Sequence, residues 1–171
     1  MRIVQAPNNY EYGNGDIVCF LGGGIQKCGW HETVLDELCR FNPTHLVVIN
    51  PKRDSFDLTN TEIAIEQIKW EFHYLNSLIN RPYIFSMYFD NSDSPQPICF
   101  YEIGRYIQIM KSFNSLDDCV ISVHPKFSRK LDVITQVSLA TDNMLIPTEC
   151  TALEHASRIH SKYREIKAYL K

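Results

Sequence analysis

The chain has 171 residues, a formal net charge of -3, and 44% hydrophobic against 22% charged residues. This length fits one compact domain with its own core, and the composition excludes a disordered or fibrous chain. The small negative net charge does not indicate a basic surface that would bind a polyanion, so duplex nucleic acid is not expected as a partner. The six cysteines contain no C-x-x-C pair, which argues against a zinc site or a redox motif.

Along the chain, residues 1–16 form a polar lead-in, and the domain proper is expected over 17–171. Short apolar runs predict buried strands, and longer stretches with apolar residues three and four apart predict helices. The expected strands are 17–21, 45–49, 83–89, 119–123 and 144–146. The expected helices are 30–41, 62–79, 98–113, 130–139 and a terminal helix ending near Tyr169. This alternation predicts an α/β fold, a single three-layer domain of flavodoxin or Rossmann type with about five parallel strands.

The amino terminus lacks the apolar core of a signal peptide, and no later stretch approaches the length of a membrane span. We therefore expect a cytoplasmic protein without membrane contact. The terminal helix carries apolar residues at helical spacing, which predicts packing on the sheet of the same chain or on a partner.

Ligands of open α/β sheets bind at the carboxyl ends of the strands, so the loops that follow the strands are the place to search. Gly22, Gly23 and Gly24 follow the first strand and allow close backbone approach to a ligand, although a tight turn explains them as well. The polar loop residues Asn50, Arg53, Asp90 and His124 are further substrate-binding candidates, and solvated or hydrogen-bonded loop positions are the alternative. Whether Lys52, Arg53, Lys126 and Arg129 converge on a phosphate stays open.

The third loop leads into a helix that carries Glu102 about one turn inside it. An acid near a helix start is often only a partner of the helix dipole, so Glu102 alone is weak evidence for chemistry. Its significance depends on the other segments around it.

Five segments, each on an expected loop or helix, follow one another in a specific order. They are Phe20-Leu21-Gly22-Gly23-Gly24-Ile25 with Trp30, Asn50-Pro51-Lys52-Arg53-Asp54, Gln67-Ile68-Lys69-Trp70-Glu71, Pro97-Ile98 with Glu102-Ile103-Gly104, and His124-Pro125-Lys126-Phe127-Ser128-Arg129-Lys130-Leu131-Asp132-Val133. This ordered set resembles the nucleoside 2-deoxyribosyltransferase family, and the resemblance covers residues 17–140.

The resemblance implies that Glu102 attacks the anomeric carbon of the sugar and that Glu71 holds or protonates the departing base. Positive charge develops on the sugar as the bond breaks, and a carboxylate both stabilises this charge and traps the sugar. Trp30 and Tyr101 match aromatic residues that pack on base or sugar, with plain core packing as the alternative. Gln96 stands where the transferases have Asp and the related nucleoside-monophosphate hydrolases have Ser, residues that contact the 5′ end of the sugar.

The expected activity is cleavage of the N-glycosidic bond of a nucleoside or nucleotide, by a 2-deoxyribosyltransferase or by a (deoxy)nucleotide N-hydrolase. Two alternatives stay open: a catalytically silent nucleotide-binding or sensing protein, and a glycosidase acting on an adenine dinucleotide. The presence of both Glu102 and Glu71 speaks against the silent protein. Because family members build their sites at or near subunit interfaces, the resemblance also implies a homo-oligomer, a dimer or larger. No cofactor or metal is expected.

Overall fold

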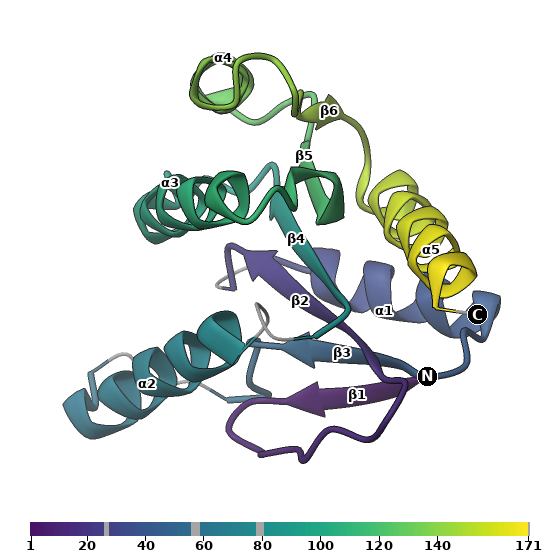
Figure 1. The fold of residues 1–171 in the computed structure, drawn as a ribbon. Helices are drawn as coiled ribbons and strands as arrows, with labels where there is room; N and C mark the ends of the chain where they lie inside the picture. The colour runs from purple at the N-terminus through teal and green to yellow at the C-terminus, as the bar shows by residue number, and fades with distance from the viewer. Residues whose placement is uncertain (26–27, 56–58, 78–80, 171) are drawn as a thin grey trace.

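The computed structural model describes residues 1–171 except 26–27, 56–58, 78–80 and 171. Its centre is a parallel sheet with the strand order β1-β3-β2-β4-β5-β6 (Figure 1). The strands are β1 (Arg2–Gln5), β2 (Ile17–Gly23), β3 (Leu46–Asn50), β4 (Tyr83–Phe89), β5 (Cys119–Val123) and β6 (Thr148–Glu149). The helices are α1 (Trp30–Phe41), α2 (Thr61–Ser77), α3 (Pro97–Ser112), the 3-10 helix η2 (Leu116–Asp118), α4 (Lys130–Ala140) and α5 (Ala152–Tyr169).

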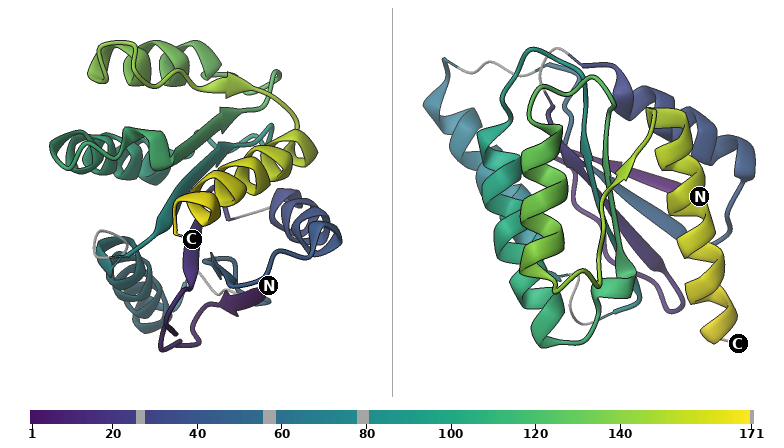
Figure 2. Two further views of the ribbon diagram at one scale, coloured as in Figure 1. Left: turned by 45° about the vertical axis from the view of Figure 1, so that its right-hand side comes forward. Right: turned by 90° about the horizontal axis from the view of Figure 1, so that it is seen from above.

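The sheet divides the interior into two cores because successive side chains of a strand point to opposite faces. Val18 and Phe20 of β2 join the core beneath α2, α3 and α4. Ile17, Cys19 and Leu21 of the same strand join the core beneath α1 and α5. Seen from above, the two helical layers flank the sheet (Figure 2). The expected three-layer α/β fold is therefore confirmed.

The strand order identifies one point of the sheet edge at which a ligand crevice is expected. The strands on either side of β2 are β3 and β4. The chain leaves β2 toward α1 on one face and leaves β4 toward α3 on the other. Ligands of open parallel sheets bind where neighbouring strands send their connections to opposite faces, so the loops after β2 and β4 border the candidate site.

Two strands differ from the sequence-based expectation. The polar lead-in contains β1, a four-residue edge strand whose Val4 is buried while Arg2 and Ile3 are exposed, a pattern too short to detect. The fifth strand was expected at 144–146, which is wrong because Met144 and Ile146 are exposed there. The sixth strand is instead the two-residue β6, which pairs with Ser122 and Val123 of β5.

The terminal helix packs within the chain. Thr151 caps α5 in a reciprocal capping box with Glu154. Ala156, Ile159 and Tyr163 are buried in the core beneath α1 and α5. Among the described residues no helix is both long and apolar enough to cross a membrane. The final two residues of the expected helix 62–79 lie outside the described residues.

Candidate active site

Two carboxylates from neighbouring helices form the chemical centre of the candidate site. Glu71 of α2 and Glu102 of α3 are both half-buried. Loss of hydration raises the pKa of Glu102 to about 8, and the nearby charge of Glu71 adds to this rise. Burial also raises the pKa of Glu71. Burial therefore favours the protonated form of both acids, and most strongly that of Glu102.

A contact between the two helices brings these acids together. The Arg105 guanidinium of α3 lies 4.5 Å from the ring centroid of Phe72 of α2. The same guanidinium donates a hydrogen bond of 3.2 Å from Nη2 to Oδ1 of Asn76. A stacked, hydrogen-bonded arginine of this kind fixes the relative position of the helix faces that carry the carboxylates.

Gln67, one turn before Glu71 on α2, connects this acid to a cation. The Gln67 Nε2 atom donates to Oε1 of Glu71 at 2.7 Å and to the carbonyl oxygen of Pro51 at 2.8 Å. Its Oε1 accepts from Nε of Arg53 at 2.6 Å. Arg53 in turn pairs with Glu66 at 2.7 Å. The hydrogen bond from Gln67 and the charge of Arg53 both act to lower the pKa of Glu71, against the effect of burial.

The loops after β2 and β4 are tied together by Gln96, the residue that precedes α3. Its Oε1 accepts from the backbone N–H of Gly24 at 3.2 Å, and its Nε2 donates to Oδ1 of Asp90. Both Gln96 and Asp90 are buried, and Ser92 donates a second hydrogen bond to Oδ1 of Asp90 at 2.9 Å. Gln96 adopts a left-handed backbone with φ 49°. The amide thus spans the crevice between the two loops.

The first two glycines of the triplet are required by packing within the protein. A Cβ atom at Gly22 would lie 2.8 Å from Cε of Met87. Gly23 has φ +146°, and a Cβ atom there would meet the carbonyl oxygen of Tyr88 and the Trp30 ring. At Gly24 the neighbouring atoms belong to the flexible Gln96 side chain. Gly22 and Gly23 therefore let β2 lie against β4 and the indole, whether or not a ligand approaches them.

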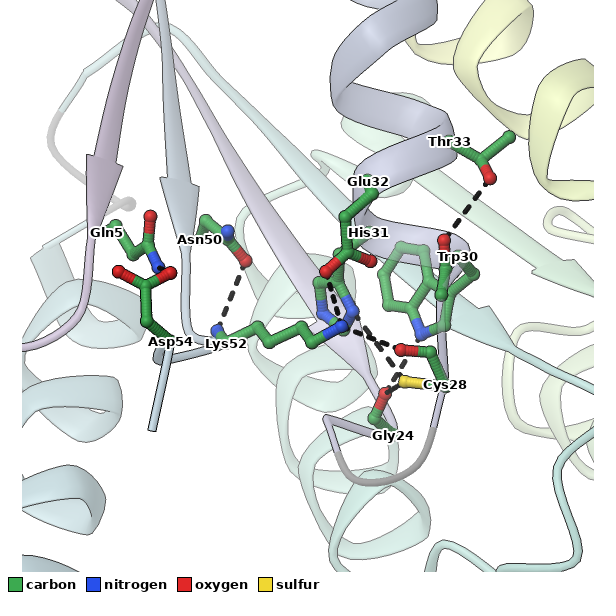
Figure 3. A network of polar contacts seen from close by, with 11 residues as sticks. Gln5, Gly24, Cys28, Trp30, His31, Glu32, Thr33, Asn50, Lys52 and Asp54 are labelled. Carbon is green, nitrogen blue, oxygen red and sulfur yellow. Dashed lines mark hydrogen bonds and ion pairs between the residues drawn. The ribbon is translucent and has the colours of Figure 1, made fainter. Parts of the chain in front are cut away.

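Trp30 is a core residue that holds the β2–α1 connection. Its ring is buried, and its indole Nε1 donates to the carbonyl oxygen of Gly24 at 2.9 Å. The same carbonyl accepts from the Cys28 thiol at 2.8 Å, and Figure 3 shows these groups gathered at the start of α1. The ring centroids of Trp30 and His31 lie 3.7 Å apart. The contacts of this indole are with the protein interior, as in the core-packing alternative.

Lys52 belongs to the same network. Its Nζ donates to the carbonyl oxygen of Cys28 at 2.7 Å and pairs with Glu32 (Figure 3). Its backbone N–H donates a hydrogen bond of 3.1 Å to Oδ1 of Asn50, and this bond makes a turn at the end of β3. Lys52 and Asn50 therefore hold the conformation of the loop that follows β3.

His31 is buried beneath the loop with a neutral ring. Burial, and then the charge of Lys52, lowers the pKa of His31 to about 3. Its Nδ1 lies 3.9 Å from the Cys28 sulfur, and its Nε2 has no hydrogen-bond partner among the residues that the structure describes.

Two further candidates lie apart from the carboxylates. Tyr101 is 68% exposed on the outer side of α3, so its ring belongs neither to the core nor to the buried part of the site. His124 lies at the end of β5, where its Nδ1 accepts from the backbone N–H of Lys126 at 3.1 Å. It forms a local turn, as expected for a hydrogen-bonded loop histidine.

The structure thus brings together part of the predicted set. Glu71 and Glu102 are neighbours, Arg53 reaches Glu71 through Gln67, and Gln96 joins Asp90 to Gly24. Gln67 was missed as a functional candidate, although its spacing of four residues before Glu71 places both on one helix face. Cys99 was also missed; burial and the charges of Glu102, Glu71 and Asp90 raise the pKa of its thiol.

A separate hollow of about 440 Å³ lies away from these acids. It is bordered by η2, the start of β5 and α5, and includes Met144, Arg158 and Lys162. Neither carboxylate of the pair lines it. Within the described part of the chain, no cluster of three His, Cys, Asp or Glu residues suits a metal ion.

The fold and the site define an α/β protein with two neighbouring carboxylates beside the crevice of a parallel sheet. No protein-family model matches this chain, and a search of curated proteins finds no matching relative.

Proposed function

We propose that this protein cleaves the N-glycosidic bond of a nucleoside or nucleotide through a covalent bond between Glu102 and the anomeric carbon. The observation that carries the proposal is the proximity of Glu71 and Glu102, since burial and then the charge of Glu71 raise the pKa of Glu102 to about 8. Bond cleavage needs a proton for the departing base and a carboxylate for the sugar, and a singly protonated pair supplies both.

The proton balance of the proposed reaction starts from a pair of carboxyl groups that carries one proton. In the first step the bond between the anomeric carbon and the base nitrogen breaks, and the proton of the pair passes to the base by way of Glu71. Glu102 is left ionised, and its carboxylate oxygen forms a bond to the anomeric carbon. In the second step water, or another base carrying its own proton, attacks this carbon. Glu102 leaves as a carboxylate, and the proton released by the attacking group returns to the pair.

The cations near the site favour an uncharged nucleoside over its 5′-phosphate. Lys52, Arg53 and Arg129 form ion pairs with acids of the same chain, namely Glu32, Glu66 and Asp132. A phosphate would have to compete with these carboxylates, and buried Asp90 adds negative charge beside the crevice. A nucleoside with a free 5′-hydroxyl avoids this repulsion.

A homo-oligomer is part of the proposal. Apolar side chains remain exposed on α2 and α3 around the two acids, with Ile68 63%, Phe72 52% and Ile98 63% exposed. Covering them with a second copy would bury apolar surface and shield the carboxylates from water. Light scattering tests this directly, since a monomer at micromolar concentration would contradict it.

The activity is tested by incubating the protein with deoxynucleosides, their 5′-monophosphates and NAD, with and without an acceptor base, and measuring released base. We expect release from a deoxynucleoside and at least a hundredfold loss in Glu102→Gln, with Glu165→Gln of α5 as the matched control. Release only in the presence of an acceptor base identifies a transferase, whereas release with water alone identifies a hydrolase. The proposal fails if no substrate yields base, and release from NAD alone would identify the dinucleotide glycosidase.

A further inference from the structure

We infer that Gln67 is a positioning residue that orients the Glu71 carboxyl group and leaves only its Oε2 atom free to carry a proton. This inference rests on the proposed function for its role in catalysis. It concerns the hydrogen-bond arrangement of α2 and the β3–α2 loop and assigns Gln67 a task that no motif suggested.

The orientation of the Gln67 amide is determined by its three partners. Its oxygen faces Nε of Arg53, which can only donate, and its nitrogen faces the Pro51 carbonyl, which can only accept. Exchanging the amide oxygen and nitrogen would place donor against donor and acceptor against acceptor. Gln67 is itself buried, so water does not replace these bonds at low cost.

This fixed amide decides which oxygen of Glu71 can carry a proton. Because its remaining N–H points at Oε1 of Glu71, that oxygen must act as an acceptor. A proton on Glu71 can then reside only on Oε2. The amide also passes on the positive charge of Arg53, which favours the carboxylate form of Glu71.

Glu102 has no comparable partner. No described residue donates a hydrogen bond to its carboxyl group, and the one charge that shifts its pKa is that of Glu71, which raises it together with burial. Because burial and the charge of Glu71 raise the pKa of Glu102, Glu102 keeps its proton to higher pH than a free glutamate, and Oε2 of Glu71 is the position through which this proton can pass to the base. The titratable and charged groups that interact with the pair are Arg53, Cys99 and Tyr106, and the groups behind them are Glu66, Asp90 and Arg105.

The test is a titration of glutamate carboxyl groups in the full chain by carbon-13 NMR, comparing the parent with Gln67→Met. Methionine has nearly the length of glutamine but cannot donate to Glu71. We expect the lower of the two titration steps of the pair, assigned to Glu71, to move up by about one pH unit, and the upper step to stay. The matched control is Lys69→Gln, an exposed change on the same helix, which should move neither step.

A second variant keeps the inference testable if Gln67→Met does not fold. Arg53→Met removes the charge behind the amide, and we expect a smaller rise of the same lower step. The inference is overturned if the lower step stays in place in the variant that folds. The titration needs no substrate, so it separates this inference from the proposed activity: absence of base release contradicts the activity alone. Where base is released, the acid limb of its pH profile should move with the lower step.

Discussion

Glu71 and Glu102 approach each other from two neighbouring helices, and the charge of Glu71 adds to the burial that raises the pKa of Glu102 to about 8. The proposed reaction needs this proton for the departing base. The proton is present below pH 8 and is lost as the pH rises through that value. We therefore expect the rate of base release between pH 5 and 10 to fall on an alkaline limb near pH 8.

Glu71→Gln gives the control for this limb. The substitution removes the negative neighbour while keeping the size of the side chain, so the pKa of Glu102 should fall and its titration should move to lower pH. The movement is read from carboxyl carbon-13 shifts, because the variant is expected to be nearly inactive. An unchanged Glu102 titration would show that the two acids do not interact.

Gly23→Ala should destabilise the protein by about 2 to 4 kcal/mol, because the new methyl group meets the Tyr88 carbonyl and Trp30 at a positive φ. Gly104→Ala is the matched control. A Cβ atom at Gly104 meets no other atom within 4 Å on α3, so alanine should leave stability unchanged or raise it slightly. Urea unfolding measures both, and equal effects would contradict the packing argument for Gly23.

Trp30→Phe separates core packing from substrate contact. Phenylalanine keeps an aromatic ring beneath the loop but loses the indole N–H bond to Gly24, so we expect a loss of stability of about 1 kcal/mol. The Cys28 thiol still donates to that carbonyl. The KM for a nucleoside should stay within about twofold of the parent value, a change worth less than 1 kcal/mol. A tenfold rise in KM without loss of stability would instead indicate stacking on the substrate.

Gln96→Asn tests the bridge across the crevice. Asparagine tolerates the left-handed backbone at this position but is one methylene too short to reach both Gly24 and Asp90. We expect a loss of stability of about 1 to 2 kcal/mol, since one of the two bonds goes to a carboxylate. Gln136→Asn, on the exposed side of α4, should have only the small effect of helix propensity. Equal losses in the two variants would remove the argument for the bridge.

Much of the fold was predictable because its signals are local. The strands β4 and β5 and the helix α1 have the expected bounds, since each is a strongly periodic or fully apolar segment between turn residues. By contrast β1 and β6 are short edge strands whose pairing depends on β3 and β5. No local pattern in four or two residues encodes such a partner.

The candidate site was predictable only in part, for a similar reason. The family resemblance pointed to Glu102 and Glu71 as candidates, but not to the fixed amide of Gln67 between Arg53 and Glu71. Glutamine on a helix is usually a solvated residue, and only the position of Pro51 and Arg53 in space reveals its task. For Trp30 the sequence left core packing and ligand contact open, and only the burial of its ring shows that it packs in the interior.

Burial shifts the pKa of histidine rings and of carboxyl groups in opposite directions, and this has a consequence for the pH dependence of stability. Under α1 and α5, burial lowers the pKa of His31 and of His155 to about 3. His155 is held there between Ser86 and Ser122 at 2.8 Å from each. Both rings take up protons only on unfolding, so stability decreases as the pH falls below their ordinary value of 6.5.

For the carboxyl group of Glu102 the pKa shift, and with it the effect of pH on stability, has the opposite sign. Glu102 keeps its proton in the folded chain up to about pH 8 but loses it near 4.5 when unfolded, so it makes stability decrease as the pH rises between these values. His31 and His155 thus govern the acid side of the pH dependence of the folding free energy, and Glu102 governs its alkaline side. Their balance places the maximum of thermal stability between about pH 6 and 7.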